Sequence, residues 1–256
     1  MKATVWVLAG ATLTMMSVLA PSVPAAEIKV LTAGAMKEVV IAAVPGFEKQ
    51  TGHKVTVMNA TVGALVKRIE GGEAFDLAIL TPAAVDALAG KGKFAAGRRV
   101  VLARVGVGVA VKEGAPKPDI STVDAFKRAL LSAKTVAYID PASGGSSGIY
   151  VAKLLARLGI AAEIKPKEKL KKGGHVADLI VSGEAELGLH QISEILAVKG
   201  ATLVGPLPAE IQNFTTYAAG IAAAANNAEA ARTLIKAIAG PAMDAVLKAR
   251  GMERAS

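Results

Sequence analysis

The chain has 256 residues, a formal net charge of +9 and no cysteine. Without cysteine it can form neither disulfide bonds nor a catalytic thiolate. Aromatic residues make up only 4% of the chain, too few for the base-stacking surface that binds single-stranded nucleic acid, so we expect no nucleic-acid partner.

The N-terminus has the pattern of a secretory signal peptide. Lys2 precedes an apolar run over residues 5–20, and Val23-Pro-Ala25 supplies the small residues of a cleavage site. The apolar run is short for a transmembrane helix, which needs about 20 residues. We therefore predict that residues 1–25 are a signal peptide cleaved near Ala25 and that the mature protein is periplasmic.

Strand and helix patterns alternate in the first part of the mature chain. Strands are expected at 27–31, 54–58 and 77–80, and helices at 36–51, 62–69 and 82–90. Gly52 stands where a helix ends, and Pro82 stands where the third helix begins. This βαβαβα order predicts a parallel sheet covered by helices.

The pattern changes near residue 105, where a β-rich run with small residues begins. Beyond it, strands are expected at 135–139, around Ile164, at 185–190 and at 214–224, and helices up to Leu158, at 174–182, at 228–239 and at 241–248. A second break lies at Gly205-Pro-Leu-Pro208. The whole pattern is typical of the α/β class.

The two breaks predict two lobes. Residues 26–105 and 206–256 would form the first lobe, and residues 106–205 would form a second lobe inserted between them. Each lobe would be a mixed, mainly parallel sheet flanked by helices. The chain would cross between the lobes twice, which makes a hinge that can close around a ligand.

Three strand-to-helix junctions are rich in small and polar residues. They are Thr32-Ala-Gly-Ala-Met36, Asn59-Ala-Thr-Val-Gly-Ala64 and Ser143-Gly-Gly-Ser-Ser-Gly148. Helix N-termini at such junctions offer unpaired N–H groups and partial positive charge to an anion. The last two junctions fall in different predicted lobes, so we expect their helix ends to face one small anion across a cleft.

The predicted ligand-binding residues belong to these junctions and to the end of the 185–190 strand. They are Ala35, Met36, Thr61, Val62, Gly63, Ser146, Ser147, Gly148, His190 and Gln191. Backbone N–H groups at 61–63 and 146–148 would be the main anchors. No cluster of His, Asp and Glu has the spacing of a metal site, so we expect neither a metal ion nor a cofactor.

At these junctions the sequence resembles the molybdate-binding family of periplasmic solute-binding proteins, which serve ABC importers. The similar segments include VLTAGAMKEVV, GALVKRIEGGEAFDLAIL, SSGIYVAKLLARLG and SGEAELGLHQISEI, and they extend along almost the whole mature chain. The resemblance implies a two-lobed, type II binding protein that closes on an oxyanion and delivers it to a permease in the inner membrane. We expect a monomer.

Several positions that the resemblance assigns to the oxyanion are changed. The family has serines where this chain has Ala35 and Gly63, a tyrosine near Gln191, and an alanine where this chain has Ser147. A buried anion without its hydrogen-bond donors is destabilised by several kcal/mol. We therefore expect a small organic anion such as a carboxylate, with molybdate or tungstate as the alternative.

Proteins similar to this family include a periplasmic aconitate isomerase, which gives the sequence an enzymatic interpretation. Moving a double bond by proton transfer requires a base near an acidic C–H group and donors for the carboxylates. His190 and His175 are the candidate catalytic residues. The sequence favours a binding protein without catalysis, and this isomerase is the alternative.

Overall fold

The computed structural model describes residues 25–97 and 99–255, so nearly all of the predicted signal peptide lies outside the described residues. The strands pair in the order β2-β1-β3-β9-β4-β7-β5-β6, and β8 and β10 both pair with β4. The expected α/β class is confirmed, and the sheet is mixed.

The strands are β1 (Glu27–Ala33), β2 (Lys54–Ala60), β3 (Leu77–Leu80), β4 (Val100–Lys112), β5 (Val136–Ile139), β6 (Glu168–Lys171), β7 (Leu187–Gln191), β8 (Ala201–Pro206), β9 (Phe214–Ile221) and β10 (Met252–Glu253). The α-helices are α1 (Lys37–Thr51), α2 (Val62–Glu70), α3 (Pro82–Ala89), α4 (Val123–Ser132), α5 (Ser146–Arg157), α6 (Ala161–Ile164), α7 (Ala177–Val181), α8 (Ile192–Ile195), α9 (Ala228–Ala239) and α10 (Asp244–Ala249). Short 3₁₀ turns are η1 (Gly34–Met36), η2 (Pro141–Ser143), η3 (Lys165–Lys167), η4 (Ala209–Ile211) and η5 (Pro241–Met243).

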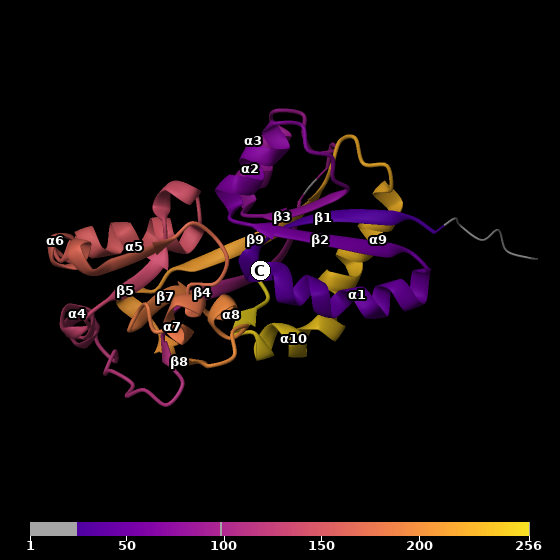
Figure 1. The fold of residues 1–256 in the computed structure, drawn as a ribbon. Coiled ribbons are helices and arrows are strands. Elements are labelled where there is room, and N and C mark those ends of the chain that lie inside the picture. The colour runs from indigo at the N-terminus through magenta and orange to yellow at the C-terminus, as the bar shows by residue number, and fades with distance from the viewer. Residues whose placement is uncertain (1–24, 98, 256) are drawn as a thin grey trace, which may run out of the picture.

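The first half of the molecule is built on β1, β2 and β3, which are parallel as the sequence predicts. Both faces of this sheet are covered, with α2 and α3 on one side and α1 and α9 on the other (Figure 1). Successive residues of β1 serve opposite faces: Val30 packs in the core under α1 and α9, and Leu31 packs under α2 and α3. That double burial explains why residues 30–33 are all buried, without the alternation seen in the first residues of the strand.

The second half has the same construction around β7, β5 and β6, which are parallel to one another. Phe126 of α4 and Val151 and Leu154 of α5 pack on one face. On the other face, Ile139 packs against Val176, which caps the start of α7, and against Ile180 within that helix. The carboxyl ends of β5 and β7 therefore lead directly into the starts of helices, as those of β1 and β2 do.

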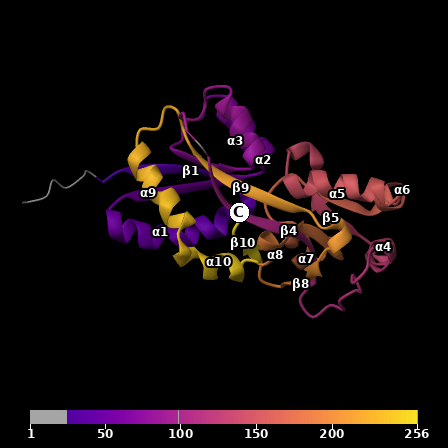
Figure 2. The same ribbon diagram turned by 180° about the vertical axis from the view of Figure 1, so that it is seen from behind.

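One long strand joins the halves. Residues 100–106 of β4 pair with β9, whereas residues 107–112 pair with β7 and β8. Figure 2 shows β4 and β9 crossing together from one half towards the other. The chain returns through the segment between β8 and β9, where the Gln212 side chain accepts from the Val107 N–H at 2.9 Å and donates to the Val107 C=O at 3.0 Å.

The strand expected around Ile164 is wrong. Ile164 ends the short helix α6 and is fully buried, and the strand is β6, a few residues further on, which pairs with β5. The β6 sequence Glu-Lys-Leu-Lys is polar because the strand lies at the end of the strand order and needs no apolar face on both sides. Because its residues are mostly charged, β6 lacks the apolar pattern by which a strand is recognised in the sequence.

Across the described residues, no helix combines the length and the apolar character needed to cross a membrane.

The link between Gln212 and Val107 predicts a stability effect. Gln212→Ala should lower the free energy of unfolding by about 1–3 kcal/mol, because the N–H of fully buried Val107 loses its acceptor, whereas the Val107 C=O still accepts from the Leu207 N–H. Urea unfolding would measure this. Gln50→Ala, on the exposed face of α1, is the control and should change stability by less than about 0.5 kcal/mol. Equal midpoints for the two variants would contradict the prediction.

Candidate functional site

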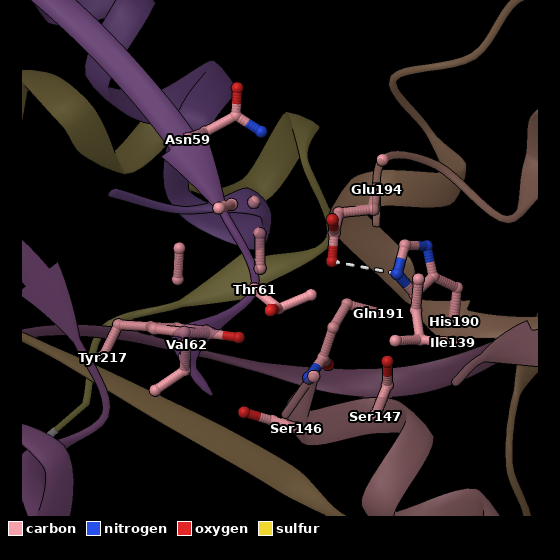
Figure 3. A pocket seen from close by; sticks show the side chains of 16 residues that line it. Asn59, Thr61, Val62, Ile139, Ser146, Ser147, His190, Gln191, Glu194 and Tyr217 are labelled. Carbon is pink, nitrogen blue, oxygen red and sulfur yellow. Dashed lines mark ion pairs between the residues drawn. The ribbon is translucent and has the colours of Figure 1, made fainter. Parts of the chain in front are cut away.

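A small cavity lies between the two halves, at the carboxyl ends of β1, β2, β5 and β7 (Figure 3). The lining residues are Ala33, Gly34, Ala35, Asn59, Ala60, Thr61, Val62, Ile139, Gly145, Ser146, Ser147, Gly174, His190, Gln191, Glu194 and Tyr217. Its free volume is about 30 Å³, which is room for about one or two water molecules. Any larger guest requires the walls to move apart.

The start of α2 forms one wall and touches the opposite half directly. Thr61 caps the helix, accepting from the Ala64 N–H at 3.2 Å, and its hydroxyl donates to the Ser143 C=O at 2.5 Å. The Gly63 N–H donates to the Gly144 C=O at 3.0 Å. These two hydrogen bonds hold the walls together across the cavity.

Only glycine fits at this contact. A Cβ atom on Gly63 would lie 2.7 Å from the Gly144 Cα, and one on Gly144 would lie 2.5 Å from the Gly63 Cα. Gly144 also has a φ of 73°, in the left-handed region that side chains disfavour. The glycines of both junctions therefore allow two backbones to meet.

The start of α5 forms the opposite wall. Ser146 and Ser147 open the helix, and Ser147 is 3% exposed. The first N–H groups of a helix have no acceptor within the helix, so they are available to a ligand. A Cβ atom on Gly148 would collide with the Ile139 carbonyl oxygen, so this glycine lets α5 begin close against β5.

His190 and Glu194 form a buried pair at the end of β7. The His190 Nε2 and Glu194 Oε2 atoms are 3.2 Å apart, and the side chains are 2% and 12% exposed. The pair arises because α8 starts directly after β7, so that Glu194 in the helix lies next to His190 near the end of the strand. In Figure 3 the Glu194 carboxyl group reaches towards the middle of the cavity. It also packs against Gly34 of η1, from the other half.

Burial governs the protonation of this pair. It raises the pKa of Glu194 to about 8, and burial together with His175 and Lys171 lowers the pKa of His190 to about 3. Both shifts favour neutral side chains near pH 7. The pair then carries one dissociable proton and no net charge.

Gln191 and Tyr217 are two further polar residues that line the cavity. The Gln191 Nε2 group donates to the Thr215 hydroxyl at 2.8 Å, while its Oε1 atom is buried without a partner in the described part of the chain. Tyr217 comes from β9 and directs its hydroxyl into the cavity (Figure 3). Burial raises the pKa of that hydroxyl, so it stays a neutral donor.

Seven of the ten predicted ligand-binding residues line the cavity: Ala35, Thr61, Val62, Ser146, Ser147, His190 and Gln191. Met36 is fully buried in the core beneath α1, and Gly63 and Gly148 are behind the lining, in the backbone contacts described above. The predicted ligand-binding residues that line the cavity thus come from both halves. His175 does not line the cavity, although its neighbour Gly174 does, but it lies close enough to His190 to help lower the pKa of that residue.

The sequence reasoning missed Glu194, Tyr217 and Asn59. Glu194 had a local signal, since it follows His190 by four residues across a strand-to-helix junction. Tyr217 had none, because it lies in the middle of β9. Within the described residues no group of three or more His, Asp and Glu could hold a metal ion.

The glycine contact gives a test of closure. Gly63→Ala should separate the walls, because the added methyl group overlaps the Gly144 backbone. We expect a larger radius of gyration by small-angle X-ray scattering, and a loss of about 1 kcal/mol of stability from the broken hydrogen bond. Gly46→Ala in α1, where a Cβ meets nothing within 4 Å, should leave the radius unchanged. An unchanged radius for Gly63→Ala would contradict the role of this contact.

Several known proteins resemble this chain in sequence or in fold. The chain is 34% identical over 236 residues to an aconitate isomerase from a Pseudomonas species, covering 90% of this chain and 88% of that protein. Its fold matches the periplasmic molybdate-binding protein of Azotobacter vinelandii (TM-score 0.76, 20% identity, 90% of this chain, 100% of that one).

A sulfate-binding protein of Mycobacterium tuberculosis also matches (TM-score 0.70, 18% identity, 90% of this chain, 88% of that one). At these identities the structural likenesses concern the fold, and the expected two-lobed, type II binding-protein fold is confirmed. The family model for bacterial extracellular solute-binding proteins matches residues 28–253. The chain belongs to this family.

Proposed function

We propose that the protein captures a small organic anion between two lobes and delivers it to an ABC-transporter permease in the inner membrane. The observation that carries this proposal is the meeting of two helix N-termini, those of α2 and α5, at one cavity. The aconitate isomerase relative supports a carboxylate. The molybdate-binding and sulfate-binding neighbours support an anion in general.

The proposed lobes are residues 26–105 with 206–256, and residues 106–205. Support comes from β4, which exchanges its partners between Gly106 and Val107. The return crossing runs between β8 and β9. Because the cavity walls belong to different lobes, rotation about these two crossings would break the Gly63–Gly144 contact and admit a ligand.

Helix termini and hydroxyl groups would hold the anion. None of the described residues that line the cavity is a lysine or an arginine. The donors offered are the first N–H groups of α5 and the hydroxyls of Ser146, Ser147 and Tyr217. Separation of the walls would add the Thr61 hydroxyl and the Gly63 N–H, which donate to the Ser143 and Gly144 carbonyls in the closed site. Such uncharged donors bind anions well where water is excluded.

A panel of anions tests this function. Thermal shift and titration calorimetry with trans-aconitate, propane-1,2,3-tricarboxylate, sulfate and molybdate should give stabilisation and binding with a carboxylate. Preference for molybdate would favour the oxyanion alternative, and no binding of any anion would overturn the proposal. Periplasmic export should appear as an N-terminus near Ala26 in protein recovered from the native periplasm.

Ser147→Asp should weaken binding about 100-fold or more, because a like charge would face the anion in a buried site. The same panel measures this, with circular dichroism to establish that the variant folds. Ser121 is exposed and does not line the cavity, so Ser121→Asp is the matched control and should bind the anion with wild-type affinity. Normal affinity in a folded Ser147→Asp variant would place the anion elsewhere.

A second candidate function is isomerisation of a small polycarboxylate by proton transfer. It is favoured by the aconitate isomerase relative and by the buried His190–Glu194 pair, which holds one proton beside the proposed ligand. His175 is a weaker candidate for a catalytic residue, because it does not line the cavity.

Turnover separates the two functions. A binding protein incubated with trans-aconitate should show stabilisation and no cis-aconitate by NMR. If the cis isomer forms, Glu194→Gln and His190→Gln should each lower kcat about 100-fold to 10,000-fold, as expected for loss of a general acid or base. Formation of the cis isomer at the wild-type rate by both variants would exclude the pair from catalysis.

A further inference from the structure

We propose that the site takes up its anion together with one proton, held between Glu194 and His190. This inference rests on the proposed function and adds its regulation by pH. It follows from a contradiction in the cavity, where a carboxyl group faces the place at which an anion would bind.

The contradiction comes from the charges that line the cavity. Glu194 reaches into it, and the described lining contains no lysine or arginine to offset a negative charge. With no proton, the His190–Glu194 pair carries a charge of −1 and repels an anion in a site where water does not screen the repulsion. With one proton the pair is neutral, wherever between Nε2 and Oε2 that proton resides. Binding therefore selects the protonated pair.

Neighbouring charged groups do not supply the missing compensation. The elements packed against α8 are β4, β7, β8 and η1, and apart from His190 their charged side chains are Arg104 and Lys112 of β4, which are both exposed. Arg104 is paired with Glu253.

Other charged groups lie further out, around His175. Lys37 is 4.0 Å from Glu38, which also lies 3.6 Å from Arg250, and Lys171 is 3.2 Å from Asp178. Each of these cations therefore has a carboxylate neighbour of its own. Tyr217, the remaining titratable group in the lining, is kept neutral by burial.

The direction of the pH dependence follows from linkage. In an open, solvated cleft, His190 and Glu194 would have ordinary pKa values of about 6.5 and 4.3, so the pair loses its last proton near pH 6.5. In the closed cleft that proton is held until the raised pKa of Glu194, about 8. Between these limits closure takes up a proton, so affinity falls as pH rises, by up to about tenfold per unit.

Calorimetry with propane-1,2,3-tricarboxylate tests the proposal. This probe has no double bond and cannot be isomerised, so proton uptake reports binding alone. Titrations at pH 7.5 in buffers of different ionisation enthalpy should give an uptake approaching one proton per bound anion. Binding of the probe with no proton uptake and no loss of affinity between pH 6.5 and 8 would overturn this inference and leave the proposed function standing.

Variants locate the proton. Glu194→Gln keeps the size of the side chain and removes its ionisation, so its affinity should stay constant between pH 6.5 and 8, with no uptake from the pair. Glu163→Gln, on the exposed surface of α6, should keep the wild-type slope. Proton uptake by Glu194→Gln equal to that of the wild type would overturn the inference, because the proton would then be held elsewhere or by the probe.

Infrared spectroscopy of the wild-type protein tests the same inference if the Glu194→Gln variant does not fold. The wild-type complex at pH 7.5 should show the C=O band of a protonated carboxyl group, which is unusual at a pH far above the ordinary carboxyl pKa of about 4. Absence of this band, together with absence of proton uptake, would overturn the inference. Failure of every anion in the panel to bind would overturn the proposed function, and this inference with it.

Discussion

The contact between two glycine backbones, Gly63 and Gly144, is the constraint on which the site depends. It brings the N-terminus of α2 to the loop that precedes α5, so that two helix dipoles converge on one cavity. A side chain at either position would force the halves apart. The same contact limits the free volume to about 30 Å³, so admission of a ligand and separation of the halves are one event.

The strand β4 makes that separation geometrically simple. It is continuous through both halves and changes partners between Gly106 and Val107, so each half keeps its own sheet and core if the strand bends there. The Gln212 side chain bridges the returning segment to the same residue, Val107. Support for both crossings is therefore concentrated around Val107, which is packed with Leu207 and Ile211 in the core of the second half.

Local pattern was enough to predict most of the fold and part of the site. The strand-to-helix junctions at Thr61 and Ser146 could be found because glycine, threonine and serine mark helix starts regardless of tertiary context. The edge strand β6 could not, since a strand with few burial demands carries no apolar pattern. Glu194 and Tyr217 join the cavity through packing of α8 and β9, which depends on contacts distant in sequence. Their roles are visible only in three dimensions.

The His190–Glu194 pair also sets the condition that catalysis at this site would have to meet. A base that abstracts a proton from carbon must have room for that proton, but the neutral pair already holds one, and burial opposes a second because it lowers the pKa of His190 to about 3. The deprotonated pair would be a better base, yet its negative charge repels a polycarboxylate. The state that accepts the anion is thus the state least able to take its proton. An isomerase built on this site would have to resolve that conflict by moving the pair's own proton first, whereas a binding protein needs only to release the proton when the lobes open.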